Sequence, residues 1–555
     1  MSIRSLSIDR SKQIKEKSDT MSTIVVYGGE LPAVCAAAKA AAKCSTATVH
    51  VIVPYASGKL GGIATVGGQN YWDIPTNVPA YANSNLPQKG TFSWLYTSPS
   101  GYNTEEMCVK LDGALTKYGN RMIIHRGYDV CDYTTVTSPK YMIKTVTIRK
   151  VLQDSKKRLY WGSASSQQVI TADLFIDASV EGRLARKINS ACTTGRFDWP
   201  AAYRKNDTTV GYAAKQQAAT LMFKMKGITP LTTDDDKDNN YKSQNGYHTY
   251  WGGSSVFTSG SIAEFNKKYA SQGYMLKPAN AAQNGTNTDE WWINAFLIFG
   301  VDGRANNRDQ GTKFYPTDQL DGTKTVDDAM ADARQFLKDH AVEVETAMHG
   351  LKGFEKAKIV LDADGYPSTG EVLYIRETVH MAIQSRYSGA TPEDTNYQLG
   401  AHEAFLAGAG STDGNDKANY AHRIGLALYN ADVHPYDPID LQEDKKWIWG
   451  YKSFRKMRPD MNIEDNTPNH PVYVPYEALI TKYVANLLIC GYAAGVSSFA
   501  WGEVRVFPNL CVLGDAAGIA AAYCATYGLN PYNLGDYEIG KIREWLTSVG
   551  ARTEK

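Results

Sequence analysis

The N-terminal part of the chain carries the clearest hydrophobic pattern. Residues 23–27 form a short, apolar and β-branched run, which predicts a buried strand of a parallel sheet. Gly28 and Gly29 follow as a turn, residues 33–43 are alanine-rich and predict a helix, and residues 48–53 predict a second strand. Strand, tight turn, helix and strand within about 30 residues form a βαβ unit, which places the free N–H groups of a helix N-terminus where a pyrophosphate binds.

A second patterned region lies near the C-terminus. Residues 486–491 form an apolar run that ends in glycine, which predicts another short buried strand. Residues 513–518 are small, and we expect them to open an alanine-rich helix. The two ends of the chain therefore resemble two halves of one nucleotide site.

The middle of the chain has a weaker pattern. Residues 63–135 show little period and many Gly, Asn, Pro and Tyr residues, which predicts loops over the nucleotide site. Residues 141–151 and 158–171 predict an antiparallel meander, and residues 174–179 a further short buried strand. Residues 197–370 alternate polar stretches with strands, with a helix over 326–348, as expected of a substrate domain whose loops cap a site.

The glycine fingerprint G-x-G-x-x-G is incomplete. Gly28 matches its first position, while Glu30 and Ala33 stand at the second and third. We expect the Glu30 carboxylate to repel a pyrophosphate unless its side chain points into solvent. Val53 stands where an acidic residue would accept hydrogen bonds from a ribose, and each such bond contributes about 1.5 to 3 kcal/mol.

Composition narrows the function classes. With 555 residues and 43% hydrophobic content, the chain can form two or three domains around large cores. A net charge of +1 gives no reason to expect a nucleic-acid or anionic-membrane partner, and no apolar run approaches the roughly 20 residues that span a bilayer. Residues 1–20 are polar and predict a disordered leader rather than a secretory signal, although translation could equally start at Met21.

The eight cysteines form no C-x-x-C motif, and several stand in apolar runs. This pattern favours reduced, buried thiols in a cytoplasmic protein over disulfides or a metal site. We therefore predict no metal centre.

A family resemblance joins these observations. The segments VVYGGELPAV (25–34) and GKLGGIATVGG (58–68) resemble the opening of the FAD-dependent oxidoreductases of the glutathione-reductase-like flavoprotein class. The resemblance continues in order along the chain, through ADLFIDASVEGRLARKINSACTTGR (172–196) and YNADVHPYD (429–437) to EVRVFPNLCVLGDAAGIAAA (503–522). Such an ordered series is far more specific than one glycine loop.

The resemblance implies an α/β fold with a Rossmann-like FAD-binding domain, built on a parallel sheet with an inserted antiparallel meander, and an inserted α+β substrate domain. It divides the chain into a leader (1–20), the first part of the FAD-binding domain (21–196), a substrate or cap domain with interleaved segments (197–486) and the C-terminal part of the FAD-binding domain (487–555). The implied function is oxidation of a small hydroxylated or amine-bearing molecule by hydride transfer to FAD. The electron acceptor, oligomeric state and mode of flavin attachment stay open.

The resemblance also implies which residues contact the cofactor. In the second half, the N-terminus of the predicted helix would face the flavin. The expected FAD contacts are Gly28, Gly29, Ala33, Lys59, Gly61, Gly62, Thr65, Asp177, Ala178, Gly182, Gly491, Gly514, Asp515, Ala517 and Gly518.

Catalysis by a flavin needs a base for the proton that accompanies the hydride. The candidates are His434 and His380, with Arg505 as an electrostatic anchor. On a strand, Asp432 and His434 would share a face, so the carboxylate could orient the imidazole. Each histidine could instead be structural, and Arg376 and Glu377 could form a structural ion pair.

Some residues depart from the family pattern or have two interpretations. Glu477 and Tyr492 stand where relatives commonly have arginine, which together with Glu30 and Val53 leaves two alternatives open. One is a flavoprotein-like scaffold with a non-redox binding role, and the other is a redox-neutral isomerase or lyase. The aromatic pairs 250–251 and 291–292 could stack a substrate ring, or simply pack in the core.

Overall fold

A five-stranded parallel sheet brings together strands from both ends of the chain. In the computed structural model its order is β23 (Leu487–Ile489), β8 (Leu174–Asp177), β1 (Ser22–Tyr27), β2 (Ala47–Val53) and β3 (Met122–Arg126). The structure describes residues 21–74, 86, 88–96, 101–188, 192–203, 214–231, 238–286, 288–381, 421–461, 471–481 and 483–555. The strands predicted at 23–27, 48–53, 174–179 and 486–491 are confirmed, while the leader predicted at 1–20 lies outside the described residues.

Both faces of this sheet are covered, which explains why its strands are apolar throughout. Ile24 and Val26 face a core shared with helices α1 (Leu31–Lys43) and α11 (Phe507–Tyr527). Val25 and Tyr27 face the opposite core, which they share with the meander. That meander consists of β4 (Tyr128–Val136), β5 (Met142–Gln153), β6 (Leu159–Trp161) and β7 (Gln168–Thr171), as predicted.

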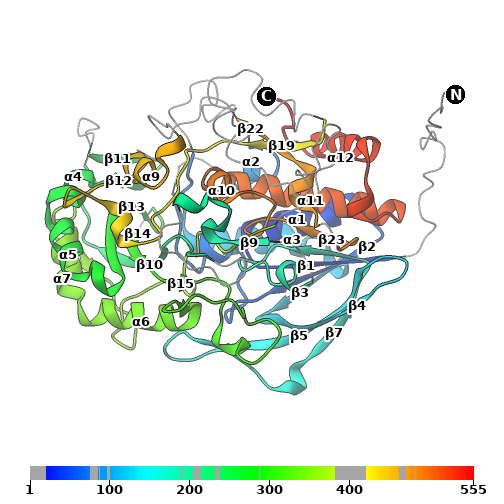
Figure 1. Cartoon of the computed structure of the whole chain (residues 1–555), viewed down its shortest axis with the longest axis horizontal. Coiled ribbons are helices and arrows are strands. Elements are labelled where there is room, and N and C mark those ends of the chain that lie inside the picture. Colours follow the sequence, from blue (N-terminus) through cyan, green and yellow to red (C-terminus); the bar gives the residue numbers. More distant parts are fainter. Residues whose placement is uncertain are drawn as a thin grey trace.

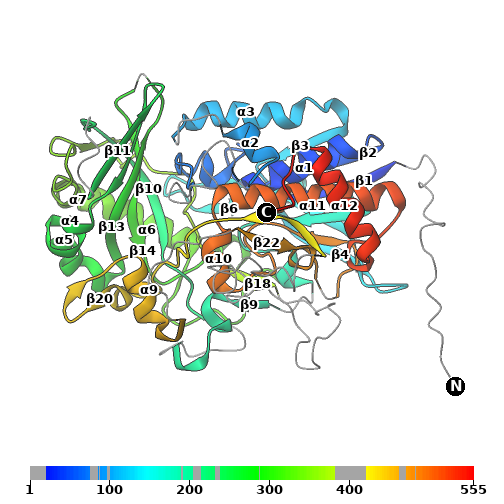
Figure 2. The same cartoon turned by 90° about the horizontal axis from the view of Figure 1, so that it is seen from above.

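Helices α1 and α11 lie side by side on one face of the sheet (Figure 2). A Cβ added at Gly514 would lie 2.4 Å from the Pro32 carbonyl oxygen, and one at Gly518 would lie 2.3 Å from that of Ala36. Real Cβ atoms do not come so close to a backbone oxygen, so the helices reach this separation because α11 lacks side chains there.

The expectation that residues 513–518 open this helix is wrong. Helix α11 begins at Phe507, with Pro508 in its first turn, so the small residues lie in mid-helix against α1. The expectation that no apolar run approaches the length of a membrane span is also wrong. Among the described residues α11 alone has the length and composition of a membrane span, and most of it is buried inside the protein.

The prediction of loops over residues 63–135 is also wrong in part. This region forms α2 (Thr91–Leu95), α3 (Thr104–Thr116), β3 and nearly all of β4. The Asn103 side chain caps α3 by accepting hydrogen bonds from the N–H groups of Glu105 (2.9 Å) and Glu106 (3.1 Å). Asn103 at the N-cap with Glu106 three residues later is a sequence signal for the start of a helix.

A second lobe holds a larger antiparallel sheet (Figure 1, green). Its six-stranded sheet has the order β11 (Asn239–Gln244), β12 (Tyr247–Gly252), β13 (Tyr274–Gln283), β14 (Trp291–Ile298), β10 (Ala219–Lys226) and β17 (Lys358–Ile359). Helices α4 (Ser254–Ser259), α5 (Ser261–Tyr269), α6 (Val326–Asp339), α7 (Ala341–Met348) and α9 (Tyr451–Met457) surround it. The predicted helix 326–348 is present but broken at His340 into α6 and α7.

Short elements complete the fold. The strand pairs are β9 (Cys192–Thr194) with β18 (Val379–Met381), β15 (Val301–Asp302) with β16 (Lys324–Thr325), β19 (Arg423–Ala427) with β22 (Val472–Pro475), and β20 (Gln442–Glu443) with β21 (Lys446–Trp447). Helices α10 (Ser498–Val504) and α12 (Asp536–Ser548) flank α11. All eight cysteines are free.

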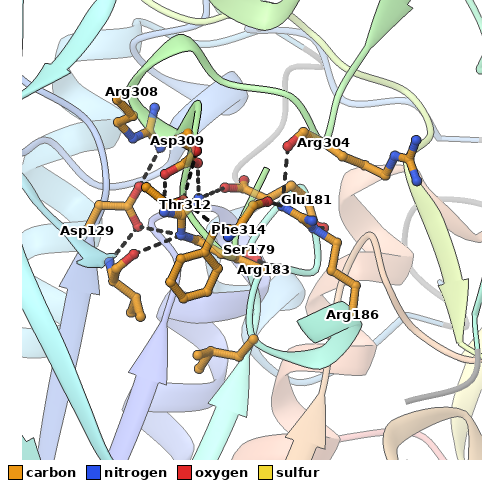
Figure 3. Close-up of polar contacts among 12 residues, drawn as sticks. Asp129, Ser179, Glu181, Arg183, Arg186, Arg304, Arg308, Asp309, Thr312 and Phe314 are labelled. Atoms are coloured by element: carbon orange, nitrogen blue, oxygen red, sulfur yellow. Dashed lines mark hydrogen bonds and ion pairs between the residues drawn. The ribbon is translucent and has the colours of Figure 1, made fainter. Parts of the chain in front are cut away.

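A buried ionic network joins the segment after β15 to the meander and to the segment after β8 (Figure 3). Arg183 pairs with Asp309, with Nη2 donating to Oδ1 over 2.6 Å, and Arg308 pairs with Asp129. Asp129 also accepts a hydrogen bond from the Tyr27 hydroxyl at 2.6 Å. Because these charges are buried, the loss of one partner would leave the other uncompensated. The network therefore fixes the segment after β15 against the parallel sheet.

The α1–α11 contact predicts the effect of adding a methyl group. Gly514→Ala and Gly518→Ala should each lower stability by about 1 to 3 kcal/mol, because the added Cβ overlaps backbone of α1. Gly113→Ala in α3 is the matched control, because nothing lies within 4 Å of its added Cβ and alanine favours the helix by about 0.5 to 1 kcal/mol. Thermal unfolding midpoints measure both effects. Unchanged midpoints for Gly514→Ala and Gly518→Ala would contradict the packing account.

Candidate functional site

The turn after β1 lies at the carboxyl edge of the parallel sheet. Gly28 has a φ of 138°, and its N–H donates to the Ile52 carbonyl oxygen at 2.9 Å. A Cβ there would lie 2.5 Å from the Ala178 carbonyl oxygen, so only glycine fits between β1 and the end of β8. A cavity of about 100 Å³ opens beside the turn, lined also by Tyr55 and Glu181. This edge is where open α/β sheets bind their ligands.

Glu30 does not point into solvent, so the condition under which its carboxylate is expected to repel a pyrophosphate is met. The Glu30 side chain is buried, and its carboxylate accepts hydrogen bonds from the Tyr55 hydroxyl (2.6 Å) and the Ile63 N–H (3.0 and 3.2 Å). Burial raises the pKa of Glu30 to about 7. Glu30 is also the N-cap residue of α1, so its carboxylate lies between that helix and the 61–63 turn.

The predicted contacts from the second glycine segment divide into two groups. Gly61 donates its N–H to the Gly29 carbonyl oxygen at 2.7 Å, and Gly62 lies against the Glu30 carboxylate. Thr65 is buried and donates to the Leu60 carbonyl oxygen at 2.7 Å, whereas Lys59 turns outward to Glu105 at 2.7 Å. The structure therefore brings Gly28, Gly29, Gly61 and Gly62 together with Ala33 in the first turn of α1, and places the Lys59 charge outside.

The residues at the end of β8 hold their own turn. Asp177 accepts hydrogen bonds from the Ser179 hydroxyl (2.7 Å) and from the N–H groups of Leu184 and Ala185 (both 2.9 Å). Burial raises the pKa of this carboxyl. Gly182 lies against Ala493, and Gly491 against Pro32 of α1. Together with Ala178, these residues therefore shape the edge of the sheet.

The predicted contacts on α11 lie away from its N-terminus. Gly514 and Gly518 contact α1, and Ala517 is fully buried. Asp515 accepts hydrogen bonds from the Thr91 N–H (2.8 Å) and hydroxyl (2.5 Å), and burial raises its pKa to about 6. These residues have a packing role in the structure, and the helix N-terminus lies about two to three turns earlier, beside Arg505.

A larger cavity of about 390 Å³ lies between the two lobes. Its volume is in the usual range for small-molecule sites, about 300 to 1,000 Å³. Strands β12 to β14 contribute one wall, and the segments around Tyr374, Asp432 and Arg505 contribute the other. The lining residues are Asp73, Trp251, Ser254, Lys277, Asn280, Asn294, Tyr374, Arg376, Tyr429, Asn430, Asp432, His434, Trp449, Gly450, Tyr451 and Arg505.

Asp432, His434 and Arg505 meet in this cavity. Arg505 donates from Nη2 to Asp432 Oδ2 (2.5 Å) and from Nη1 to the Tyr374 hydroxyl (2.7 Å). His434 Nε2 lies 3.5 Å from Asp432 Oδ1, and His434 Nδ1 has no hydrogen-bond partner. The segment is not a strand as expected, yet carboxylate and imidazole do face each other.

The charges of this group follow from its surroundings. Burial, and then the nearby Arg376, lower the pKa of His434, so the imidazole is neutral. Burial opposes ionisation of Asp432, but Arg505 and His434 overcome it and hold its pKa well below its usual value. The result is a neutral imidazole beside an ionised carboxylate, which is the arrangement of a base with an orienting group.

His380 lies apart from this group and is not among the residues that line the cavity. It is fully buried, with Nε2 3.1 Å from Glu377 Oε1, and this pairing raises its pKa against the effect of burial. Glu377 therefore pairs with His380, and the ion pair suggested between Arg376 and Glu377 is not made in the described structure.

The sequence pattern did not predict several of the cavity residues, Lys277 and Asn280 among them. Strand β13 loses its register with β14 between Leu276 and Asn280, so Lys277 stands in a bulge. Pro278 inside an apolar strand was the available signal, because proline in a sheet marks an edge or a bulge. Of the aromatic pairs, Tyr250 and Trp291 are core residues, whereas Trp251 is 48% exposed and lines the cavity.

The other departures from the family pattern also have structural partners. Glu477 is fully buried, and its Oε1 lies 2.5 Å from His422 Nδ1. Tyr492 packs against Trp501, with ring centroids 5.4 Å apart. Val53 packs beside Gly29 and Tyr55 at the end of β2.

Comparisons with solved structures return matches at low similarity, flavin-dependent halogenases among them. The myxobacterial chondrochloren halogenase CndH shares 8% identity at a TM-score of 0.35, over 95% of this chain and 79% of that one. The flavin-dependent halogenase CmlS shares 10% identity at a TM-score of 0.36, over 96% and 62%. The tetracycline destructase Tet(51) shares 8% at 0.34, over 96% and 88%.

A search of curated proteins finds no match to the chain. The family comparison is decisive, because the model of the FAD dependent oxidoreductases matches residues 23–546, nearly the whole sequence. The chain therefore belongs to the FAD-dependent oxidoreductase family, and its cofactor is FAD.

Proposed function

We propose that this protein oxidises a small hydroxylated or amine-bearing organic molecule by hydride transfer to FAD, as an oxidase or a dehydrogenase. The observation that carries the proposal is the 390 Å³ cavity that holds His434, Asp432 and Arg505 beside the N-terminus of α11. Bound FAD would supply the hydride acceptor. The absence of a second nucleotide fingerprint in the sequence favours these reactions over an NAD(P)H-dependent reduction.

At the carboxyl edge of the sheet, the course of the protein backbone suits a bound dinucleotide. The Gly28 turn, the first turn of α1 and the 61–63 turn converge there, and the N-terminus of α1 suits an anion. The N–H groups of Gly28 and Gly61 already donate to the carbonyl oxygens of Ile52 and Gly29. The side chains fit less well, because the Glu30 carboxylate takes the Ile63 N–H, and the Tyr55 ring covers Gly29. FAD therefore fits this chain once Glu30 and Tyr55 give up part of the space they fill.

His434 has the properties of the general base. With Nε2 protonated toward Asp432, its Nδ1 carries a lone pair that no other group uses. Asp432 would hold the ring in that orientation and stabilise the imidazolium that forms when a substrate hydroxyl or amine loses its proton. Arg505, held by Asp432 and Tyr374, would stabilise negative charge on the substrate oxygen.

The absorption spectrum between 300 and 700 nm tests the proposal first. Flavin bands that bleach anaerobically on addition of substrate, and return with an electron acceptor, support it. Colourless protein that gains no flavin on incubation with FAD would contradict the redox function and favour a non-redox binding role. Bound flavin that stays oxidised during turnover would favour a redox-neutral isomerase or lyase.

Removal of the His434 imidazole should slow the chemical step. His434→Gln is expected to lower the rate of anaerobic flavin reduction by about 10² to 10⁴, the usual contribution of a general base. Because the pKa of His434 is lowered, the base stays deprotonated at pH 6.5, and the acid limb of the wild-type rate profile should lie below that pH. His248→Gln, outside the cavity, is the control. A normal reduction rate in His434→Gln would contradict the assignment.

The Glu30 carboxylate should weaken FAD binding when it is ionised. Its pKa of about 7 means that FAD affinity in the wild type should rise as pH falls through 7. Glu30→Gln keeps the side-chain shape and removes the charge, so we expect FAD to bind at least about tenfold more tightly at pH 8, with little pH dependence. Titration of the apoprotein with FAD, followed by flavin fluorescence, measures both effects.

Glu105→Gln, at the exposed end of the Lys59 ion pair, is the control for this experiment. Equal FAD affinities for Glu30→Gln and wild type across pH 6 to 8 would show that Glu30 does not compete with the cofactor.

A further inference from the structure

Two buried cations in the cavity between the lobes lack an anionic partner. Lys277 is 4% exposed, and its Nζ donates to the Pro278 carbonyl oxygen (3.1 Å) and Asn280 Oδ1 (3.5 Å). Arg376 is 1% exposed, and its Nη1 donates to the Ala218 carbonyl oxygen (2.9 Å) and the Thr220 hydroxyl (2.6 Å). Arg376 Nε has no hydrogen-bond partner. Within the described structure neither side chain makes an ion pair.

The carboxylates of the cavity are too few to compensate these charges. Asp432 pairs with Arg505, which leaves Asp73 for both Lys277 and Arg376. Burial and the neighbouring Arg376 lower the pKa of Lys277 to about 7, and burial and Asp432 raise that of Asp73 to about 6. When Lys277 is protonated, its charge and those of Arg376 and Arg505 exceed the charges of the two carboxylates by one, and His434 is neutral, so the cavity has a net charge of +1.

The position of Lys277 follows from an irregularity in its sheet. The register of β13 against β14 changes between Leu276 and Asn280, so the Lys277 segment bulges out of the pairing. Bulges of this kind turn a side chain toward a site. In a regular strand an unpaired lysine would not be expected at a buried position, because its desolvation is unfavourable.

The remaining walls suit a polar molecule with an apolar face. Trp251 and Trp449 line the cavity with exposed or half-buried rings, and Lys277 Nζ lies 5.9 Å from the centre of the Trp449 ring. Asn280, Asn294 and Asn430 add amide groups, and the Oδ1 atoms of Asn294 and Asn430 have no hydrogen-bond partner. Free amide oxygens accept hydrogen bonds from hydroxyl groups.

We propose that the substrate is a hydroxylated carboxylic acid, whose carboxylate binds between Lys277 and Arg376. A carboxylate carries the single negative charge that neutralises the cavity, and its oxygens match the donors of a guanidinium. This assignment rests on the proposed function for its account of oxidation, whereas the binding of the anion does not depend on flavin chemistry.

The test is anion binding by the full chain in thermal shift titrations at constant ionic strength. Lactate, gluconate, glucuronate, phosphate and sulfate are compared with chloride, and the methyl ester of glucuronate serves as an uncharged match. We expect at least one carboxylate to raise the unfolding temperature saturably, and glucuronate methyl ester to have no such effect. Lys277→Met and Arg376→Met should each lower the affinity of the protein for that carboxylate at least tenfold.

Lys144→Met, at an exposed position on β5, is the matched control and should bind as wild type does. Lys277→Met removes a buried charge while it keeps the length of the side chain, so its unfolding temperature without anion should be maintained or raised, which separates lost binding from lost folding. Arg376→Lys keeps the charge and should retain part of the affinity.

Three results would overturn the proposal. The first is a wild-type protein that no carboxylate stabilises beyond chloride, and the second is unchanged carboxylate affinity in Lys277→Met and Arg376→Met. The third is tighter binding of phosphate or sulfate than of any carboxylate. FAD content and anaerobic bleaching are recorded in the same preparations. A protein that binds carboxylates and carries no reducible flavin would contradict the redox function and support the anion site.

Discussion

The close contact between α1 and α11 is the constraint on which the site depends. Gly514 and Gly518 let α11 approach the backbone of α1 at Pro32 and Ala36, and both helices then cover the same face of the parallel sheet. This contact holds the Gly28 turn and the start of α11 within one structure, although they lie about 480 positions apart in the sequence. The opposite face is fixed by buried ion pairs, because Arg308–Asp129 joins the segment after β15 to the meander and Arg183–Asp309 joins it to the segment after β8.

Charge is distributed unequally between the two cavities that this frame creates. The edge near Gly28 contains the buried Glu30 carboxylate, which takes a backbone N–H that an anion could use. The cavity between the lobes has a cationic excess in Lys277, Arg376 and Arg505. The edge near Gly28 opposes a bound phosphate until Glu30 is protonated or displaced. The cavity between the lobes favours a bound anion without any such change. At the proposed positions, cofactor and substrate would therefore meet opposite electrostatic conditions in one protein.

Much of the fold was readable because it depends on local pattern. The βαβ unit, the strand at 174–177 and the meander follow from local hydrophobic patterns, and the structure contains each of them. The start of α11 was misplaced because small residues can mark either a helix N-terminus or a tight helix contact, and only the neighbouring helix decides. His434, Asp432 and Arg505 were found from the family resemblance. Lys277 and Arg376 were not found as cavity residues, because a buried unpaired cation is defined by what surrounds it in space.

A crystal structure of the protein soaked or co-crystallised with FAD tests the central claim most directly. The account predicts FAD along the carboxyl edge of the parallel sheet, its pyrophosphate at the Gly28 turn with the Glu30 side chain moved from the Ile63 N–H, and its flavin beside Arg505 at the opening of the larger cavity. FAD bound elsewhere, or a complex in which Glu30 keeps its contacts and the cavity beside Arg505 does not meet the flavin, would contradict it.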